Sequence, residues 1–272
     1  MVNVHACLHP ERWDSHVHLF DAQAAAVSGH YQPVDRTLQS IEAVAICENV
    51  SRLVLVQPSV YGADNSVLLE GLSAGHRLHR GVVVLDDTVD EQAMQAMHEL
   101  GVRGVRFNLV SPVGNGPGAL LTFKKLAPRL QLFGWHVQWY AEATDLHTIA
   151  SLHEGSGVPA VLDHLAGMGA HIDEKHPAWM TLEKLAQMGS WVKLSGWYRL
   201  HADFPYRSLD AAVERIARLF PGRMVWGSDW PHTLFKPEVA PTYGAMLEPM
   251  SRVLSPAEKE DALTVAPARL YG

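Results

Sequence analysis

The chain has 272 residues, of which 47% are hydrophobic and 19% are charged, and its formal net charge is -7 at pH 7. This length and hydrophobic content suffice for one large globular core. The acidic balance and the lack of a basic run argue against a nucleic-acid partner, and no stretch reaches the ~20 apolar residues of a membrane-spanning helix.

The N-terminal residues and the two cysteines bear on the location of the protein. The first seven residues lack the basic and apolar regions of a secretion signal. Cys7 and Cys47 have neither a metal-binding nor a redox spacing. We therefore expect a cytoplasmic protein with free thiols.

Apolar strand-like runs alternate with helix-like segments along the whole chain. In chain order, we predict strands at residues 13–18, 52–57, 81–85, 102–108, 136–141, 158–164, 191–195 and 223–229. Helices are predicted between them at residues 35–49, 66–74, 90–100, from 118 to 133, 144–154, 177–188 and 209–219, followed by closing helices at 239–250 and 256–265.

The predicted strands are continuous apolar runs, as expected for parallel strands that are buried on both faces. Eight such strand–helix units predict an α/β fold, a single-domain (β/α)8 TIM barrel over residues 1–272. An open doubly wound sheet is the alternative. That fold usually carries a Gly-rich turn after its first strand, where this chain has His16-Val17-His18.

The first predicted strand places two histidines side by side. His16 and His18 are two residues apart, so their side chains point the same way in an extended strand and Val17 points the other way. Two adjacent imidazoles can bind a metal, hold a carboxylate or polarise a carbonyl. Because the chain has 16 histidines, this spacing also arises by chance. The residues at the other strand ends decide whether the pair belongs to a functional site.

Polar and titratable residues follow nearly every predicted strand, and in a barrel the strand ends meet on one rim. These residues are Gln57, Ser59, Tyr61, Arg106, Asn108, Tyr140, Glu142, Asp163, His164, Ser195, Tyr198, Arg199, Ser228, Asp229 and His232. Such groups are costly in a core and are expected in a site. Each has an ordinary structural interpretation alone, but their coincidence on one rim predicts an active site.

These motifs resemble the amidohydrolase superfamily, and most closely the lactonase branch that contains 2-pyrone-4,6-dicarboxylate hydrolase. The resemblance runs nearly end to end. Its most specific segments are Arg-Gly-Val-Arg-Phe-Asn at 103–108 and Ser-Asp-Trp-Pro-His at 228–232, joined by the first-strand histidines and His164. The resemblance implies a lactonase that acts in the degradation of aromatic compounds.

The residues that this chain lacks bear on its metal content. Two-metal members of the resembled superfamily supply a carboxylated lysine from strand four and histidines from strands five and six. Here strand four ends in Arg106, strand five ends in Tyr140, and His136 begins strand five. One Zn²⁺ could be held by His16, His18, His164 and Asp229. Because two arginines would oppose a dication, we expect catalysis without a metal or other cofactor, with one Zn²⁺ as the alternative.

The roles of the candidate residues follow from lactone hydrolysis. Asp229 is predicted to be the general base that activates a water for attack on the lactone carbonyl. The catalytic histidines, His16, His18 and His164, are predicted to orient Asp229 or to donate to the carbonyl oxygen.

Substrate binding is assigned to four residues. Arg106 and Arg199 are expected to bind substrate carboxylates, because a guanidinium meets a carboxylate in a two-point fork. Ser59 and Tyr140 match positions that contact substrate in the resembled hydrolase. That hydrolase carries a further substrate arginine six residues after the position of Arg106, where this chain has Pro112.

The change at Pro112 leaves two possibilities for the substrate. Either another residue, such as Arg207, contacts a second carboxylate, or the substrate has fewer carboxylates. The predicted function is hydrolysis of a carboxylate-bearing lactone similar to 2-pyrone-4,6-dicarboxylate. The alternatives are a zinc-dependent sugar-lactone or muconolactone-type lactonase, a metal-dependent decarboxylase of an aromatic acid, and a barrel that binds a ligand without chemistry. The expected partner is a small lactone or carboxylate, and a homo-oligomer remains possible.

Overall fold

The computed structural model of the chain describes residues 11–28, 31–111 and 118–272. Eight strands form one sheet in sequence order, and every pair of neighbours is parallel. They are β1 Arg12–Val17, β2 Val50–Val56, β3 Arg80–Val83, β4 Val102–Asn108, β5 His136–Tyr140, β6 Ala160–Leu162, β7 Trp191–Leu194 and β8 Met224–Trp226.

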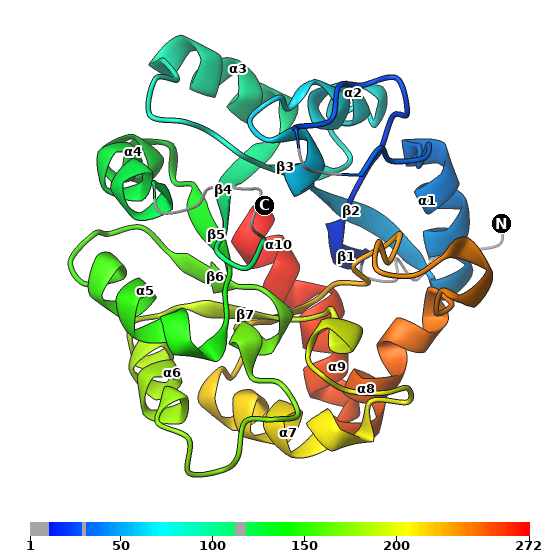
Figure 1. Cartoon of the computed structure of the whole chain (residues 1–272), viewed down its shortest axis with the longest axis vertical. Helices are drawn as coiled ribbons and strands as arrows, with labels where there is room; N and C mark the ends of the chain where they lie inside the picture. Colours follow the sequence, from blue (N-terminus) through cyan, green and yellow to red (C-terminus); the bar gives the residue numbers. More distant parts are fainter. Residues whose placement is uncertain (1–10, 29–30, 112–117) are drawn as a thin grey trace, which may run out of the picture.

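The sheet closes between its first and last strands. The backbone N–H of His18 donates to the carbonyl oxygen of Trp230 over 2.9 Å, and the N–H of Asp229 donates to the carbonyl oxygen of His16 over 2.9 Å. Figure 1 shows the strands at the centre and the helices arranged around them. The predicted (β/α)8 barrel is therefore confirmed.

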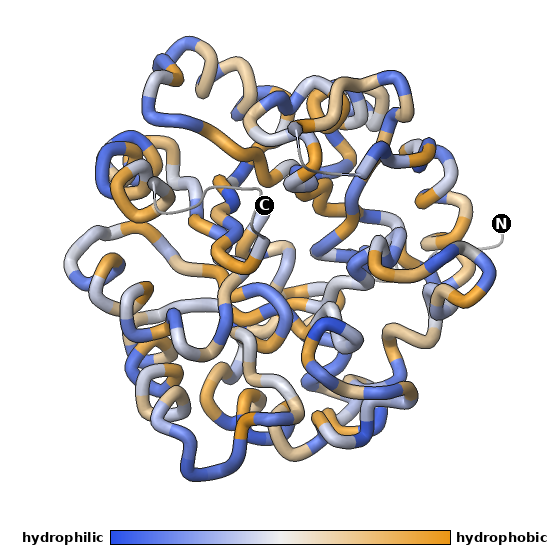
Figure 2. Tube along the Cα trace, viewed as in Figure 1, coloured by the Kyte–Doolittle hydropathy of each residue, from blue (hydrophilic) through white to orange (hydrophobic). Residues whose placement is uncertain are grey.

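Helices connect successive strands and cover the outside of the barrel. They are α1 Leu38–Ala45, α2 Ser66–Ala74, α3 Glu91–Leu100, α4 Ala119–Phe133, α5 Leu146–His153, α6 Ala178–Gln187 and α7 Asp210–Leu219, followed after β8 by α8 Glu248–Val253, α9 Pro256–Leu263 and α10 Val265–Tyr271. Hydrophobic and hydrophilic residues alternate along the outer helices in Figure 2, as expected for helices that bury one face.

Side-chain caps set the starts of three of the described helices, α1, α3 and α9. The carboxylate of Asp90 accepts from the N–H of Ala93 over 2.7 Å, which confirms the predicted cap of α3. The hydroxyl of Thr37 accepts from the N–H of Ser40, so α1 begins at Leu38, three residues later than predicted.

The helix predicted at residues 239–250 is wrong. This segment forms two short 3-10 turns, η7 Pro237–Val239 and η8 Gly244–Leu247, and the α-helix begins only at Glu248. Pro241 explains the interruption, because proline lacks an N–H and forces the preceding residue out of the helical region. Ala240 accordingly has an extended backbone, with φ -65° and ψ 142°.

The C-terminal residues form a helix, α10, that was not predicted. Tyr271 is fully buried and stacks on Trp13 of β1 at a centroid distance of 6.2 Å. Its ring also meets His136, the first residue of β5, edge to face at 5.3 Å. Figure 1 shows α10 crossing behind the centre of the ring of strands. His136 therefore lies at the amino end of the strands, away from the catalytic rim, as the sequence predicted.

We expect the stability of the protein to fall as the pH is lowered from 6.5 toward 4. Burial lowers the pKa of His136 from 6.5 to about 3, and the charge of Lys193 adds to this. The unfolded chain therefore binds a proton between these values that the folded chain does not. Each such histidine costs about 1.4 kcal/mol of unfolding free energy per pH unit.

Denaturant unfolding between pH 4 and 8 tests this expectation. The His136→Asn variant, which has no imidazole to protonate, should show a shallower decrease than the wild type. His147→Asn, on the exposed face of α5, is the control and should retain the wild-type slope. Equal slopes for all three proteins would exclude His136 as a source of acid sensitivity.

No helix in the described part of the chain is long and apolar enough to span a bilayer. Cys47 is exposed with a free thiol. Cys7 lies outside the described residues.

Candidate active site

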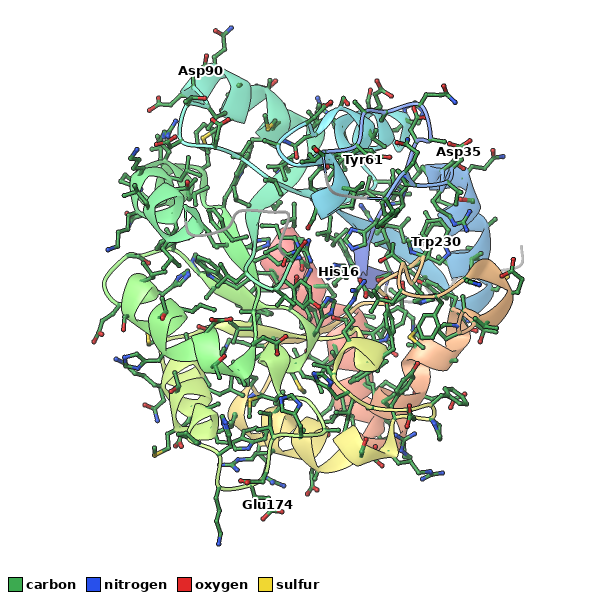
Figure 3. All side chains as sticks on the ribbon, in the orientation of Figure 1. His16, Asp35, Tyr61, Asp90, Glu174 and Trp230 are labelled. Atoms are coloured by element: carbon green, nitrogen blue, oxygen red, sulfur yellow. The ribbon has the colours of Figure 1, made fainter. Side chains whose placement is uncertain are left out.

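Strand β1 and the end of β8 are joined by a buried carboxylate. One oxygen of Asp14 accepts from the backbone N–H groups of His16 (3.0 Å) and Ser228 (2.9 Å), and the other accepts from the hydroxyl of Tyr243 (2.9 Å). Burial raises the pKa of Asp14 to about 6 despite these donors. Asp14 thus fixes the two segments that carry the histidines and Asp229. Figure 3 places His16 near the centre of the ring of strands, with Trp230 beside it.

Asp229 is fully buried and its two oxygens have different surroundings. Oδ2 accepts from Arg199 Nε and from the Tyr198 hydroxyl, each over 2.6 Å. Oδ1 lies 3.4 Å from His18 Nε2 and 3.6 Å from His16 Nε2 and has no hydrogen-bond partner. Burial alone would raise the pKa of Asp229, but Arg199 and the imidazoles outweigh it and hold that pKa well below its usual range. Asp229 is therefore a carboxylate with one open oxygen.

The tautomer of His18 follows from its backbone contact. His18 Nδ1 lies 2.8 Å from the carbonyl oxygen of Val56. A carbonyl oxygen only accepts, so Nδ1 carries the proton, and in the neutral ring Nε2 has a lone pair that faces Asp229. The two facing acceptors, His18 Nε2 and Asp229 Oδ1, require a hydrogen-bond donor or a cation between them. Because these atoms are 3.4 Å apart, a water that donates to both would lie to one side of the line that joins them.

His164 begins the 3-10 turn η4, His164–Gly167, at the end of β6. Its Nδ1 lies 2.9 Å from the Ser195 hydroxyl, and its ring packs 5.0 Å from His16 and 4.8 Å from Tyr140. Burial lowers the pKa of His164 to about 4, so the ring is neutral at pH 7. Gly196 is required beside it, because a Cβ there would lie 2.3 Å from His164 Nδ1.

A charged network lies beneath His16. Lys193 of β7 is fully buried, and its ammonium donates to the Ser15 carbonyl (2.8 Å) and to Gln138 Oε1 (2.6 Å). It also lies 3.7 Å from Asp163 Oδ1 and 3.4 Å from His16 Nδ1. Burial lowers the pKa of Lys193 to about 8.

Asp163 is the acidic centre of this network. Its Oδ2 accepts from Gln138 Nε2 (2.9 Å) and lies 3.3 Å from Arg106 Nε, and its Oδ1 lies 3.4 Å from His16 Nδ1. Burial raises the pKa of Asp163, but His16, Lys193 and Arg106 together hold it well below its usual range. The network therefore contacts the side of the His16 ring that faces away from Asp229.

Sequence reasoning did not assign a role to Lys193, Gln138 or Tyr198, and it treated Asp163 only as one of many strand-end residues. The sequence signal that could have identified Lys193 is its position two residues after Trp191. Trp191 packs into a small apolar cluster inside the barrel, and side chains two apart in a strand share a face.

A cavity of about 350 Å³, here called the main cavity, opens above the histidines. The predicted site residues on its wall are His18, Ser59, Arg106, Tyr140 and Arg199, and its other walls are formed by Phe20, Tyr31, Pro58, Val60, Asn108, Val110, Ser111, Thr233 and Leu234. All four predicted substrate-binding residues thus line one cavity, together with His18. His16, His164 and Asp229 do not line it and are buried next to one another.

The two arginines of the main cavity are held differently. Both guanidinium groups face the Tyr140 ring, Arg106 at 5.5 Å and Arg199 at 5.9 Å from the centroid. Arg199, predicted as a substrate anchor, donates to Asp229 through Nε and to the Thr233 hydroxyl through Nη2. Arg207, the suggested second anchor, is exposed in the turn η6 Arg207–Leu209 and does not line this cavity. Pro112 lies outside the described residues.

Comparison with known proteins identifies the family. The amidohydrolase family profile matches residues 13–272. The chain belongs to the amidohydrolase family. It is 28% identical to 4-sulfomuconolactone hydrolase of Rhizobium radiobacter over an alignment of 267 residues. This alignment covers 96% of this chain and 89% of the relative. It is 29% identical over 274 residues to 2-pyrone-4,6-dicarboxylate hydrolase of Comamonas testosteroni, with 95% and 89% covered.

A solved structure is similarly close to this amidohydrolase. The Pseudomonas putida protein, assigned as a 2-pyrone-4,6-dicarboxylic acid hydrolase, superimposes with a TM-score of 0.86 at 28% identity and covers 97% of this chain and 98% of its own. The resemblance to the lactonase branch of the superfamily is therefore confirmed.

The amidohydrolase family implies a metal, and the described residues offer two groups of donors that share His16. His164, predicted as a fourth ligand with His16, His18 and Asp229, falls in the second group with His16 and Asp163. In the first group, Nε2 of His16, Nε2 of His18 and Oδ1 of Asp229 lie within 4.8 Å of one another, and Oδ1 and His16 Nε2 lack hydrogen-bond partners. The Nδ1–H of His18 binds a backbone carbonyl, as in many metal-bound histidines. These three residues would hold a single divalent ion, which would polarise a carbonyl or acidify a water. Arg106, near the end of β4, has no atom that can coordinate a metal.

Proposed function

We propose that this amidohydrolase hydrolyses a lactone that carries a carboxylate, with Asp229 as the general base. The observation that supports this most directly is the unpartnered oxygen of Asp229, which lies next to His16 and to His18, a residue of the main cavity wall. A water there donates to Asp229 Oδ1 and can attack a carbonyl above it. The similarity to two lactone hydrolases over nearly the whole chain supports the same reaction class.

The attacking water is activated by proton transfer. Arg199 and Tyr198 hold the other oxygen of Asp229, which orients the carboxylate and leaves Oδ1 to accept the proton of the water as its oxygen attacks. The ester C–O bond then breaks, and the released ring oxygen takes up the proton. The products are the ring-opened acid and no other species.

Charge that develops on the carbonyl oxygen needs hydrogen-bond donors. His164 is neutral, and in the tautomer in which the Ser195 hydroxyl donates to Nδ1, Nε2 carries the proton and is the donor. We assign His164 this role, since removal of one such donor typically lowers kcat by about 10²–10³-fold. Arg106, with Ser59 and Tyr140, then binds the substrate carboxylate at the wall of the main cavity.

We propose further that this chemistry proceeds without a metal. Arg199 contacts Asp229 directly, and Lys193 lies 3.4 Å from His16. Both cations oppose a divalent ion at the three donor atoms. The protein purified without chelator should contain well below one equivalent of zinc by elemental analysis, and prolonged chelation should leave kcat unchanged. Stoichiometric zinc, with activity lost on its removal and restored by its return, would contradict this.

A panel of lactones tests the proposed reaction. Carboxylated pyrones, muconolactone and aldonolactones should be compared with an uncharged lactone, with the ring-opened acid detected by chromatography. We expect kcat/KM for the best carboxylated lactone to exceed that of the uncharged one by about 10²-fold, and Arg106→Met to reduce this ratio toward one. Release of CO2 would instead identify a decarboxylase, and no turnover of any lactone would overturn the proposal.

A further inference from the structure

A second cavity of about 270 Å³, here called the side lobe, adjoins the main cavity. The two cavities share Ser59, Arg106 and Asn108 on their walls. The rest of the side lobe is formed by Val27, Gly62, Ala63, Val84, Leu85, Asp86, Gly118 and Thr122. We propose that the side lobe binds an uncharged substituent of the lactone, so that the preferred substrate carries a single carboxylate, bound at Arg106. This inference rests on the proposed function.

The inner wall of the side lobe is apolar and fixed. Val84 and Leu85, which follow β3, are buried with exposures of 8% and 5%. Val27 is tied to the next loop by its N–H, which donates to the Val60 carbonyl over 2.7 Å. Gly62 has a φ of +54°, and a Cβ there would lie 3.1 Å from Val27. A wall of this kind fits an alkyl or hydroxyalkyl group better than an anion.

The wall between the two cavities is held by its own hydrogen bonds. The Asn108 amide donates to the Ser59 hydroxyl over 2.7 Å, and its carbonyl oxygen accepts from the N–H groups of Val110 (3.0 Å) and Ser111 (2.9 Å). Asn108 therefore acts as a rigid divider. Arg106 reaches both cavities across this divider, so a carboxylate bound to it would lie at the junction.

The side lobe carries a negative charge at its outer edge. Asp86 is exposed, and its Oδ1 accepts from the N–H and the hydroxyl of Thr88. These donors hold the pKa of Asp86 below its usual value, so it is ionised at pH 7. Among the residues that the structure describes on the side lobe, Arg106 is the one cationic side chain. A second substrate carboxylate in the side lobe would thus face Asp86 without a cation of its own.

Adjacent carboxylates provide a matched pair of variants. Asp86 lines the side lobe, whereas Asp87 pairs with Lys125 and does not line it. The kcat/KM values for muconolactone, a monocarboxylate, and for 2-pyrone-4,6-dicarboxylate should be measured with the full-length wild type, Asp86→Asn and Asp87→Asn. We expect the wild type to favour the monocarboxylate by about tenfold or more, because like charges repel at this range.

In Asp86→Asn the preference for the monocarboxylate should fall about five- to tenfold, a modest change because solvent screens the charge of the exposed Asp86. In Asp87→Asn the preference should stay within twofold of the wild type. A wild-type preference for the dicarboxylate, or the same response in both variants, would overturn the inference. Calorimetric affinities for the two lactones, measured with the same three proteins, must show the same order. If neither lactone is hydrolysed, the proposed function fails, and these affinities still decide the role of the side lobe.

Discussion

Replacing Asp229 with asparagine is expected to lower kcat for lactone hydrolysis by about 10³–10⁴-fold while leaving ligand affinity within a few-fold of the wild type. The amide keeps the shape of the carboxylate but cannot accept the proton of the attacking water. In the proposed function the substrate carboxylate is bound by Arg106, which pairs with Asp163, not Asp229. Chemistry and binding should therefore separate in this variant.

The measurement combines steady-state kinetics with calorimetric binding of a slowly hydrolysed lactone. Asp210→Asn is the matched control, because Asp210 also pairs with an arginine, Arg252, but does so on α7 outside the cavity. It should keep wild-type kcat. Thermal melting must show that D229N is folded, since the variant leaves Arg199 without its carboxylate partner. Retention of more than about a tenth of wild-type kcat would exclude Asp229 as the general base.

The barrel was predictable because its strands are short apolar runs that end in polar residues. Strand β4 illustrates this, since Val102, Val105 and Phe107 are fully buried and Asn108 then turns to the cavity. The closing segment was not predictable from apolar periodicity. The residues around Pro241 have helical spacing but not the backbone N–H that a helix requires.

The rim of the site was predictable, whereas the partners of its residues were not. Arg199 was expected to bind substrate, but the turn η5, Trp197–Arg199, follows Gly196 at a φ of +58° and directs the guanidinium to Asp229. β7 and β8 are paired neighbours in the sheet, so the contact depends on the conformations of the two loops that follow them. An arginine that orients the base and one that binds a substrate have the same sequence signal.

Lys193, inside the barrel, is a second residue whose contacts could not be predicted from the sequence. In sequence it is one polar residue in a four-residue strand, a pattern typical of a solvent-facing position. Its acceptors come from β1 and β5, which the chain places 178 and 55 residues away. Composition alone does not indicate that an ammonium group is fully buried at the centre of a barrel.

Replacing Lys193 with methionine is expected to lower kcat by about 10²-fold with little change in KM. Lys193 touches neither the main cavity nor the side lobe among the described residues, so it acts as a positioning residue through His16 and Asp163. Without the ammonium, His16 Nδ1 and Asp163 Oδ1 lose a shared cationic neighbour. The His16 ring is then free to change its tautomer and its orientation toward Asp229. This change lowers kcat, whereas the loss of a substrate contact would change KM.

The pH profile separates positioning from simple structural support. Because burial lowers the pKa of Lys193 to about 8, wild-type kcat should fall above that pH as the ammonium loses its proton. The Lys193→Met variant should lack this alkaline decrease. The folded lysine binds its proton less tightly than the unfolded one. The contribution of this group to the unfolding free energy therefore rises as the pH increases from about 8 to 10.5. Melting temperatures across this range distinguish a loss of catalysis from unfolding.

Removal of a buried charge can prevent folding, and a second variant keeps the test decisive. Gln138→Met removes the oxygen that accepts from Lys193 over 2.6 Å. An ammonium with one acceptor fewer has a lower pKa, so the alkaline decrease in kcat should move below pH 8. Lys184→Met, at an exposed lysine of α6 paired with Glu154, is the control and should retain the wild-type profile. An unchanged alkaline decrease in Gln138→Met would show that Lys193 does not set the activity of this site.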